Sequence, residues 1–308
     1  MDFDPFLNNL KTNRNCSAET IKAYRSDLKM FETFLHGRSI SRLSQINHLV
    51  IKGYIEDMQK KVNLRSARIG LAESSIARRL AAISSYFEFV RANSDQELRN
   101  PLKEVLRKWQ KNNRPKPVDD MTLEFLITGM TNLRDRTLFT LFLASGLRVS
   151  EMHRLNRDSI RMDADEVGPE DYPPEDDHLC GCGEVVGKGN KLRKFYVDAR
   201  TLYLYAEYLV TRTDQNPALF LSERKQRMSV RAIQYTLATW CARLGAPHIN
   251  VHRLRHSYAT RLANADIPSM VLKDLMGHSS LTTTLGYFKL NDKTLARGYF
   301  SAMERVNR

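Results

Sequence analysis

The sequence has few cysteines and no long apolar stretch. Its four cysteines, at positions 16, 180, 182 and 241, are sparse and unevenly spaced over 308 residues. This excludes a disulfide framework and favours a reducing cytoplasm. No run of 18 apolar residues occurs, so we expect no membrane-spanning helix. The opening MDFDPFLNNLKTNRN lacks an apolar stretch before a cleavage site, so we also expect no signal peptide.

Acidic residues are also fewer than basic ones. Lys and Arg number 48 against 35 Asp and Glu, which leaves a formal net charge of +13. Such an excess favours a polyanionic partner, and the alternative is a basic protein without one. The length is enough for two domains, each with its own core.

The first third predicts a small helical bundle. Apolar residues recur at helical spacing from Ile21 to Leu35, after Ser17 as an N-cap, and again from Ile76 to Val90. A weaker helix covers about 47–59, and another begins near Pro101. Basic residues beside the two clear stripes are either a solvated face or phosphate contacts: Lys22, Arg25, Lys29, Arg78 and Arg79.

The stretch KNNRPKPVDD, residues 111–120, interrupts the helical pattern and suits an extended linker. We therefore expect a helical N-terminal domain over 1–111, a linker over 112–118 and a second domain over 119–308. In the second domain we expect helices over 120–129 and 133–143, a β-hairpin in EVVGKGNKLRKFYVDA, and helices again from about 199. An acidic insertion, residues 163–183, is expected to be an exposed loop leading into a strand. The predicted fold is mainly α with a small antiparallel sheet.

The second domain also contains an unusual set of cationic and nucleophilic residues. VHRLRHSYAT, residues 251–260, holds two histidines and two arginines within five positions. Arg148 follows a glycine turn in LASGLRVSEMHRL, and Glu151 comes one helical turn later. Lys188 lies between two glycines in GKGNKLR, and His278 follows a helix-ending glycine in LMGHSS. Tyr287 stands nine residues further on.

These residue types suit the chemistry of a phosphodiester. Arginine forks supply permanently charged, bidentate donors to the nonbridging oxygens, where charge develops. A tyrosine hydroxyl can attack phosphorus to form a covalent intermediate. Lys188 on the hairpin can protonate the departing 5′ oxygen, and His252 can manage the proton of the tyrosine at neutral pH.

Taken in order, these motifs resemble the signature of the tyrosine site-specific recombinases, especially the Xer-like bacterial members. The resemblance implies an N-terminal core-binding domain and an α+β catalytic domain. It implies a catalytic set made up of Arg148, Lys188, His252, Arg255, His278 and Tyr287. In that set the arginines and His278 bind the scissile phosphate, Lys188 is the general acid and Tyr287 the nucleophile. Glu151 resembles the acidic residue that steadies such a site.

The resemblance also implies how the protein acts. It implies a 3′-phosphotyrosine intermediate formed on a double-stranded recombination site by a DNA-bound homotetramer that passes through a Holliday junction. A paralogous recombinase or a directionality factor is a further expected partner. The C-terminal tail, residues 291–308, is expected to pack against a neighbouring subunit. No cofactor, metal or membrane is expected, and the location is cytoplasmic, with the nucleoid. The acidic insertion departs from compact Xer-like members.

Several residues have competing interpretations. Lys191 is the rival of Lys188 as the acid, and with Arg193 it is a further candidate DNA contact. Tyr299 is a rival nucleophile, although the spacing from His278 favours Tyr287. His256 is expected to have a packing role. A partial zinc site formed by His178, Cys180 and Cys182 lacks an evident fourth ligand.

Two alternatives remain for the protein as a whole. A type IB topoisomerase uses related chemistry to relax supercoils, and a non-catalytic DNA-binding protein could have the same fold. The DNA sequence that is read stays open, because bases are distinguished by side chains whose position in the grooves the sequence does not reveal. The biological task is equally open between dimer resolution, integration or excision of a mobile element, and inversion.

Overall fold

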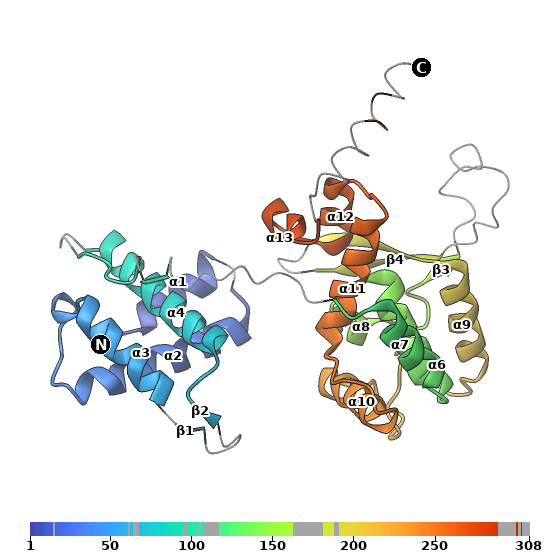
Figure 1. Cartoon of the computed structure of the whole chain (residues 1–308), viewed down its shortest axis with the longest axis horizontal. Helices are drawn as coiled ribbons and strands as arrows, with labels where there is room; N and C mark the ends of the chain where they lie inside the picture. The colour runs from blue at the N-terminus through green and yellow to red at the C-terminus, as the bar shows by residue number, and fades with distance from the viewer. Residues whose placement is uncertain are drawn as a thin grey trace. The chain divides into compact units, whose positions relative to one another are not determined.

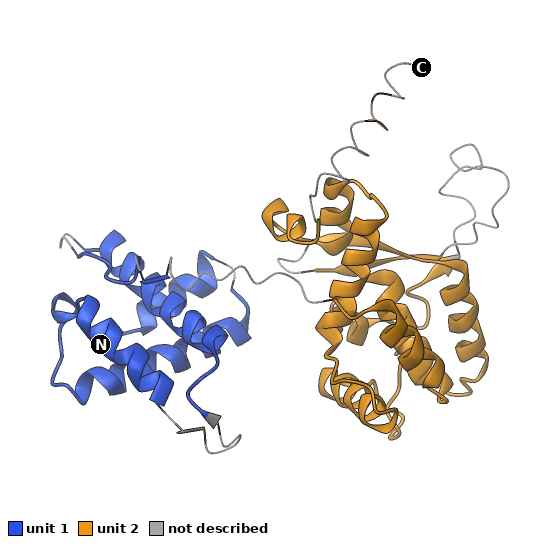
Figure 2. Ribbon diagram, viewed as in Figure 1, with its two compact units in different colours: residues 1–113 blue, residues 114–308 orange. Residues whose placement is uncertain are grey.

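The computed structural model divides the chain into two compact units, Met1–Asn113 and Arg114–Arg308 (Figure 2). Each is described separately. The structure describes residues 1–14, 16–60, 62–63, 68–94, 98–103, 105–106, 117–162, 181–187, 191–288, 300 and 303. Much of the predicted linker, most of the acidic insertion, and nearly all of the tail 291–308 lie outside these residues, as do His178, Cys180, Lys188 and Tyr299.

The N-terminal unit is a helical bundle with one short hairpin. Its described elements are α1 (Asp4–Thr12), α2 (Ala18–His36), η1 (Leu43–Gln45), α3 (His48–Lys60), β1 (Val62–Asn63), β2 (Arg68–Ile69) and α4 (Glu73–Ala92) (Figure 1). Ser17 caps α2 by accepting a hydrogen bond from the Thr20 N–H, as its position predicts. The two apolar stripes become the buried faces of α2 and α4, which pack against each other. The sequence did not predict α1 or the hairpin.

The second unit places a small sheet among helices. Its described elements are α6 (Asp120–Gly129), α7 (Leu133–Ser145), α8 (Val149–Arg154), β3 (Arg161–Met162), β4 (Gly181–Val186), β5 (Leu192–Val197), α9 (Ala199–Val210), α10 (Val230–Arg243), α11 (Val251–Asn264), α12 (Ser269–Met276) and α13 (Leu281–Leu285) (Figure 1). The strands are antiparallel in the order β3-β4-β5. The fold class predicted from the sequence, mainly α with a small antiparallel sheet, is confirmed.

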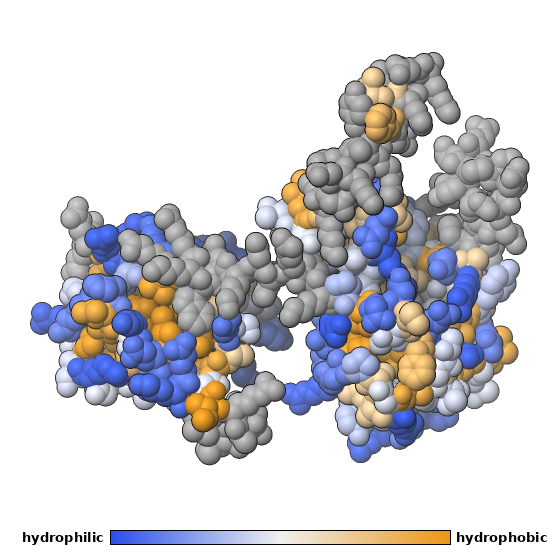
Figure 3. Space-filling view, viewed as in Figure 1, coloured by the Kyte–Doolittle hydropathy of each residue, from blue (hydrophilic) through white to orange (hydrophobic). Residues whose placement is uncertain are grey.

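The second unit contains two apolar clusters of unequal size. The larger one joins α6, α7, α9 and α10 to the inner face of the sheet, and includes Phe139, Phe142 and Phe195. The smaller one joins α11 to α12 and contains Tyr258, Leu272, Met276 and Tyr287 among its buried residues. The predicted nucleophile therefore lies in the smaller cluster. On the face drawn in Figure 3, hydrophilic side chains cover much of the surface of each unit, and hydrophobic residues are exposed among the hydrophilic ones.

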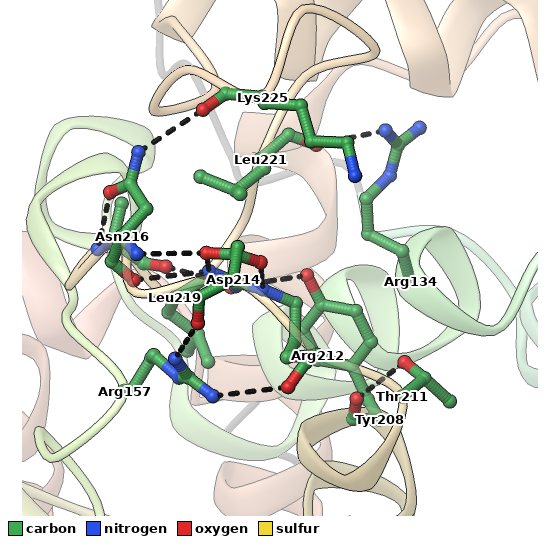
Figure 4. A network of polar contacts seen from close by, with 11 residues as sticks. Arg134, Arg157, Tyr208, Thr211, Arg212, Asp214, Asn216, Leu219, Leu221 and Lys225 are labelled. Carbon is green, nitrogen blue, oxygen red and sulfur yellow. Dashed lines mark hydrogen bonds and ion pairs between the residues drawn. The ribbon is translucent and has the colours of Figure 1, made fainter.

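A polar network fixes the loop between α9 and α10 (Figure 4). The Arg212 guanidinium, which is 6 % exposed, binds both carboxylate oxygens of Asp214 at 2.6 and 2.8 Å. It also donates to the carbonyl of Leu219 at 2.5 Å. The Leu219 N–H in turn donates to the carbonyl of Leu155 at 3.0 Å, just past α8. The loop thereby supports the C-terminal end of α8, the helix that Arg148 caps.

The described residues contain no helix that is long and apolar enough to cross a membrane. Within the same residues, no group of three or more His, Cys, Asp or Glu side chains could hold a metal ion.

Candidate active site

Arg148 is positioned by a glycine turn between α7 and α8. Gly146 ends α7 with φ +58°, in the left-handed region that favours glycine. A Cβ atom at Gly146 would lie 2.2 Å from Cδ1 of Tyr258, so only glycine allows α11 to approach this turn. Arg148 then serves as the N-cap of α8.

Glu151 is the buried centre of the site. Its side chain is 1 % exposed and its Oε2 accepts the Arg148 N–H at 2.7 Å. Oε1 lies 2.9 Å from the Arg148 guanidinium, and Oε2 lies 2.7 Å from that of Arg193. Burial raises the pKa of Glu151, but the charge of Arg193 and the hydrogen bonds from Arg148 and Arg193 outweigh burial and lower the pKa overall. Glu151 is therefore ionised at neutral pH and provides the negative charge that pairs with the arginines.

Three arginines bind three consecutive carbonyls at the C-terminal end of α12. Arg193 donates to Leu275, Arg255 to Met276, and Arg148 to Gly277, the last at 2.9 Å. The last carbonyls of a helix have no partner within the helix and carry partial negative charge, so cations stabilise them. The arginines consequently hold the end of α12, and with it His278, beside Glu151.

Arg255 is the most deeply buried of the three, with 2 % of its side chain exposed. Besides Met276 it donates to the carbonyl of Gly146 at 2.5 Å, which ties α11 to the turn before Arg148. Burial, with the charge of Arg148, lowers its pKa to about 9. The guanidinium therefore keeps its positive charge at neutral pH.

Tyr287 follows α13 and is 5 % exposed. Its hydroxyl lies 2.7 Å from Nδ1 of His256, and its ring stacks on that of His278, with centroids 6.3 Å apart. Nδ1 of His278 lies 2.9 Å from the hydroxyl of Thr284. The rings of His252 and His256 meet edge to face, with centroids 4.4 Å apart. The nucleophile predicted from the sequence thus lies among three histidines.

All three histidines are neutral at neutral pH. Burial, followed by the charges of Arg255 and Arg148, lowers the pKa of His278 to about 4 and also lowers the pKa of His252. Burial, then His252 and Arg255, lowers the pKa of His256 to about 4. Burial raises the pKa of Tyr287, although Arg255 and Arg148 oppose it, so its hydroxyl keeps its proton.

Five of the six predicted catalytic residues lie in this part of the second unit, around Glu151: Arg148, His252, Arg255, His278 and Tyr287. The sixth, Lys188, lies outside the described residues. The Gly187 N–H donates to the carbonyl of Lys191 at 2.8 Å across the end of the hairpin. A Cβ atom at Gly187 would lie 3.6 Å from Nη1 of Arg148, so the hairpin enters the site directly before Lys188.

The predicted DNA contacts have different surroundings. Lys22, Arg25 and Lys29 are exposed on α2, and Arg25 pairs with Asp4 at 2.8 Å. Lys191 is also exposed.

Arg78, Arg79 and Arg193 are also engaged with protein groups, although Arg78, like Arg25, keeps 47 % of its side chain exposed. Arg78 and Arg79 pair with the buried Asp27. Arg193 is 7 % exposed and binds Glu151 and the end of α12. The sequence did not predict these buried contacts of Arg193, because its partners lie on segments that are distant along the chain.

His256 is a second residue whose contact the sequence analysis missed. The sequence predicted only a packing role for His256 and did not predict its hydrogen bond with Tyr287. One signal was available: His252 and His256 are four positions apart, which places both on one face of α11.

Two family models together match most of the chain. The model described as "Phage integrase family" matches residues 120–294, and the one described as "Phage integrase, N-terminal SAM-like domain" matches residues 3–94. A tyrosine recombinase XerC of Haemophilus influenzae (strain PittEE) is 31 % identical over 97 % of this chain and 96 % of its own length. One of Roseiflexus castenholzii (strain DSM 13941 / HLO8) is 28 % identical over 94 % of this chain and 89 % of its own length. The chain belongs to the phage integrase family, and the resemblance found in the sequence is confirmed.

Solved structures share the fold. XerH recombinase bound to a palindromic difH substrate, in a post-cleavage complex, has a TM-score of 0.69 at 19 % identity, covering 94 % of this chain and 81 % of that one. The Tn1549 transposon integrase in complex with circular intermediate DNA has a TM-score of 0.69 at 18 % identity, covering 95 % and 96 %.

Proposed function

We propose that this protein is a site-specific DNA recombinase that cleaves and rejoins strands through a 3′-phosphotyrosine at Tyr287. The observation that carries the proposal is the buried tyrosine hydroxyl in a site that also holds two arginines, Arg148 and Arg255. Family membership and recombinase relatives along nearly the whole chain support it. The same relatives disfavour a type IB topoisomerase and a non-catalytic binding protein.

Each residue has a role in this proposal. Arg148, Arg255 and His278 bind the nonbridging oxygens of the scissile phosphate, where charge develops during attack. Glu151 keeps the arginines oriented. Lys188 protonates the departing 5′ oxygen, and the close approach of Gly187 to Arg148 supports this assignment. The resemblance implies a role for His252 in proton transfer.

The partner is double-stranded DNA carrying a recombination site. A net charge of +13 favours such a polyanion, and the exposed Lys22, Arg25 and Lys29 are candidate phosphate contacts. We propose assembly as a homotetramer on DNA, with the tail 291–308 against a neighbouring subunit. We also propose that a paralogous recombinase or a directionality factor is a further partner. The proposed location is with the nucleoid.

The test begins by letting the protein select its own site. Sheared genomic DNA of the source organism is incubated with the protein and denatured with detergent, and covalently attached fragments are sequenced. A duplex carrying the recovered site, nicked to prevent rejoining, then serves as the probe. The wild type should accumulate a covalent adduct, and Tyr287→Phe should bind the duplex equally well but form none, because only the attacking oxygen is lost. An adduct formed by Tyr287→Phe would show that the nucleophile is another tyrosine.

A further inference from the structure

The hydroxyl of Tyr287 has a single hydrogen-bond partner among the residues that the structure describes, and it is His256. The hydroxyl lies 2.7 Å from Nδ1 of His256. The other two histidines contact different groups: His278 directs its Nδ1 to Thr284 at 2.9 Å, and His252 meets the ring of His256 edge to face. The nucleophilic oxygen is therefore paired with one particular imidazole.

The protonation states, together with the lack of another acceptor for the hydroxyl among the described residues, assign the direction of this hydrogen bond. His256 is neutral at neutral pH, because burial and the neighbouring His252, Arg255 and Arg253 lower its pKa to about 4. Tyr287 keeps its proton, because burial raises its pKa. With no other acceptor described for the hydroxyl, the phenol donates and Nδ1 accepts, which places the proton of the imidazole on Nε2. The pair is thus arranged as an acid and its base before any DNA is bound.

We propose that His256, rather than His252, is the catalytic residue that removes the proton of Tyr287 during strand cleavage. The inference rests on the proposed function. As the tyrosine oxygen forms its bond to phosphorus, its proton moves to Nδ1 of His256. The bond from phosphorus to the 5′ oxygen breaks, and that oxygen takes a proton from the general acid assigned above to Lys188.

Rejoining reverses each step. The 5′ hydroxyl attacks phosphorus and returns its proton to the general acid, while the phosphotyrosine bond breaks. The departing phenolate takes back the proton that His256 held, so the cycle gains and loses no proton. The imidazolium that exists in between lies beside the phosphotyrosyl phosphodiester, whose single negative charge partly offsets the repulsion of Arg253 and Arg255.

Removal of His256 should change how cleavage depends on pH. Single-turnover adduct formation is measured on the nicked duplex defined above, for the wild type, His256→Ala and His256→Asn. The wild-type rate should be nearly constant between about pH 6 and pH 8, because the base is already neutral. His256→Ala should be about 10²–10⁴-fold slower at neutral pH. Its rate should rise about tenfold per pH unit, because hydroxide must then deprotonate the tyrosine.

Two further measurements separate proton transfer from positioning. His256→Asn keeps a hydrogen-bond acceptor near the hydroxyl but cannot take its proton, so it should be as slow and as steep in pH as His256→Ala. Imidazole added to His256→Ala should restore the rate in a saturable manner. A wild-type rate in His256→Asn, or a slow His256→Ala with a flat pH profile and no rescue, would reduce His256 to a positioning residue and overturn the proposal.

His252→Ala is the matched control, since it removes the other histidine on the same face of α11. It should slow cleavage by a factor that does not depend on pH. If His252→Ala showed the steep profile and His256→Ala did not, the base would be His252. Wild-type adduct formation is the reference that keeps the two proposals apart. A wild type without adduct contradicts the proposed function, whereas a normal wild type with an unaffected His256→Ala contradicts this inference alone.

Discussion

Each of the two units buries a carboxylate against arginines, and the two centres differ in how many such partners there are and in how completely they are buried. Asp27 in the N-terminal unit and Glu151 in the second unit are both 1 % exposed. The partners of Asp27 are Arg78, which is 47 % exposed, and Arg79. Glu151 has three guanidinium partners, Arg148, Arg193 and, at 3.9 Å, Arg255, and also accepts a backbone N–H. The two carboxylates are therefore equally buried, but they differ in the number and geometry of the groups that donate hydrogen bonds to them.

The pKa shifts of the two carboxyl groups have opposite signs. Burial raises the pKa of Asp27, and Arg78 and Arg79 only partly offset this. At Glu151 burial acts in the same direction, but Arg193 and the donors from Arg148 reverse it. Because the arginines around Glu151 also reach α12, its charge organises the site, whereas Asp27 is a packing feature of α2 and α4.

The largest expected effect comes from neutralising the two carboxylates in turn. Glu151→Gln leaves buried guanidiniums without their counter-charge and should destabilise the second unit by about 3–5 kcal/mol. Asp27→Asn should cost the N-terminal unit about 1 kcal/mol or less, because water can solvate Arg78. Amide hydrogen exchange followed by mass spectrometry reports protection in each unit separately. Equal losses in the two units would show that the donors make no difference.

Covalent adduct formation should separate the two variants as well. We expect Glu151→Gln to lower the rate on the nicked duplex by about 10²-fold or more, because the phosphate-binding arginines lose their orientation. Asp27→Asn should stay within about twofold of the wild type, since it lies in the other unit.

A smaller effect is expected from a second arginine of each centre. Arg193→Lys keeps the charge, but one ammonium group cannot replace the planar fork that binds both Glu151 and the carbonyl of Leu275. We expect a decrease in cleavage rate of about 10–10²-fold through misplacement of α12, with DNA affinity little changed. Arg79→Lys is the matched control and should change the cleavage rate by less than about twofold. A normal rate in Arg193→Lys would remove it from the site.

The smallest expected effect is a pH dependence of opposite sign in the two units. Glu151 has a lowered folded pKa, so its contribution to stability is present above the unfolded value of about 4.3 and is lost as pH falls toward the folded pKa. Asp27 has a raised folded pKa, so its contribution falls as pH rises from about 3.9 through that pKa. Hydrogen exchange measured from about pH 6 to pH 3 checks this, with Glu151→Gln and Asp27→Asn as the references that remove each contribution. Differences of the same sign would contradict it.

Local patterns predicted much of the fold. Apolar residues at helical spacing predicted α2 and α4, and the Ser17 cap was confirmed. Turn residues between two apolar runs predicted the hairpin of β4 and β5. The helix α1 was missed, although its buried Phe6, Leu7 and Leu10 pack into the core of the first unit. A nine-residue helix carries a weak periodic signal, and packing against α2 and α4 stabilises it.

The sequence by itself determined the residue types of the site and those contacts that are short along the chain. Arg148 and Glu151 are three positions apart, so the start of one helix brings them together. Contacts between distant segments depended on the tertiary structure. Arg193 is buried because β5 lies against α8 and α12, and His256 rather than His252 reaches Tyr287 because of how the segment after α13 packs on α11. Residues four apart on a helix share one face, and only the packing partner selects between them.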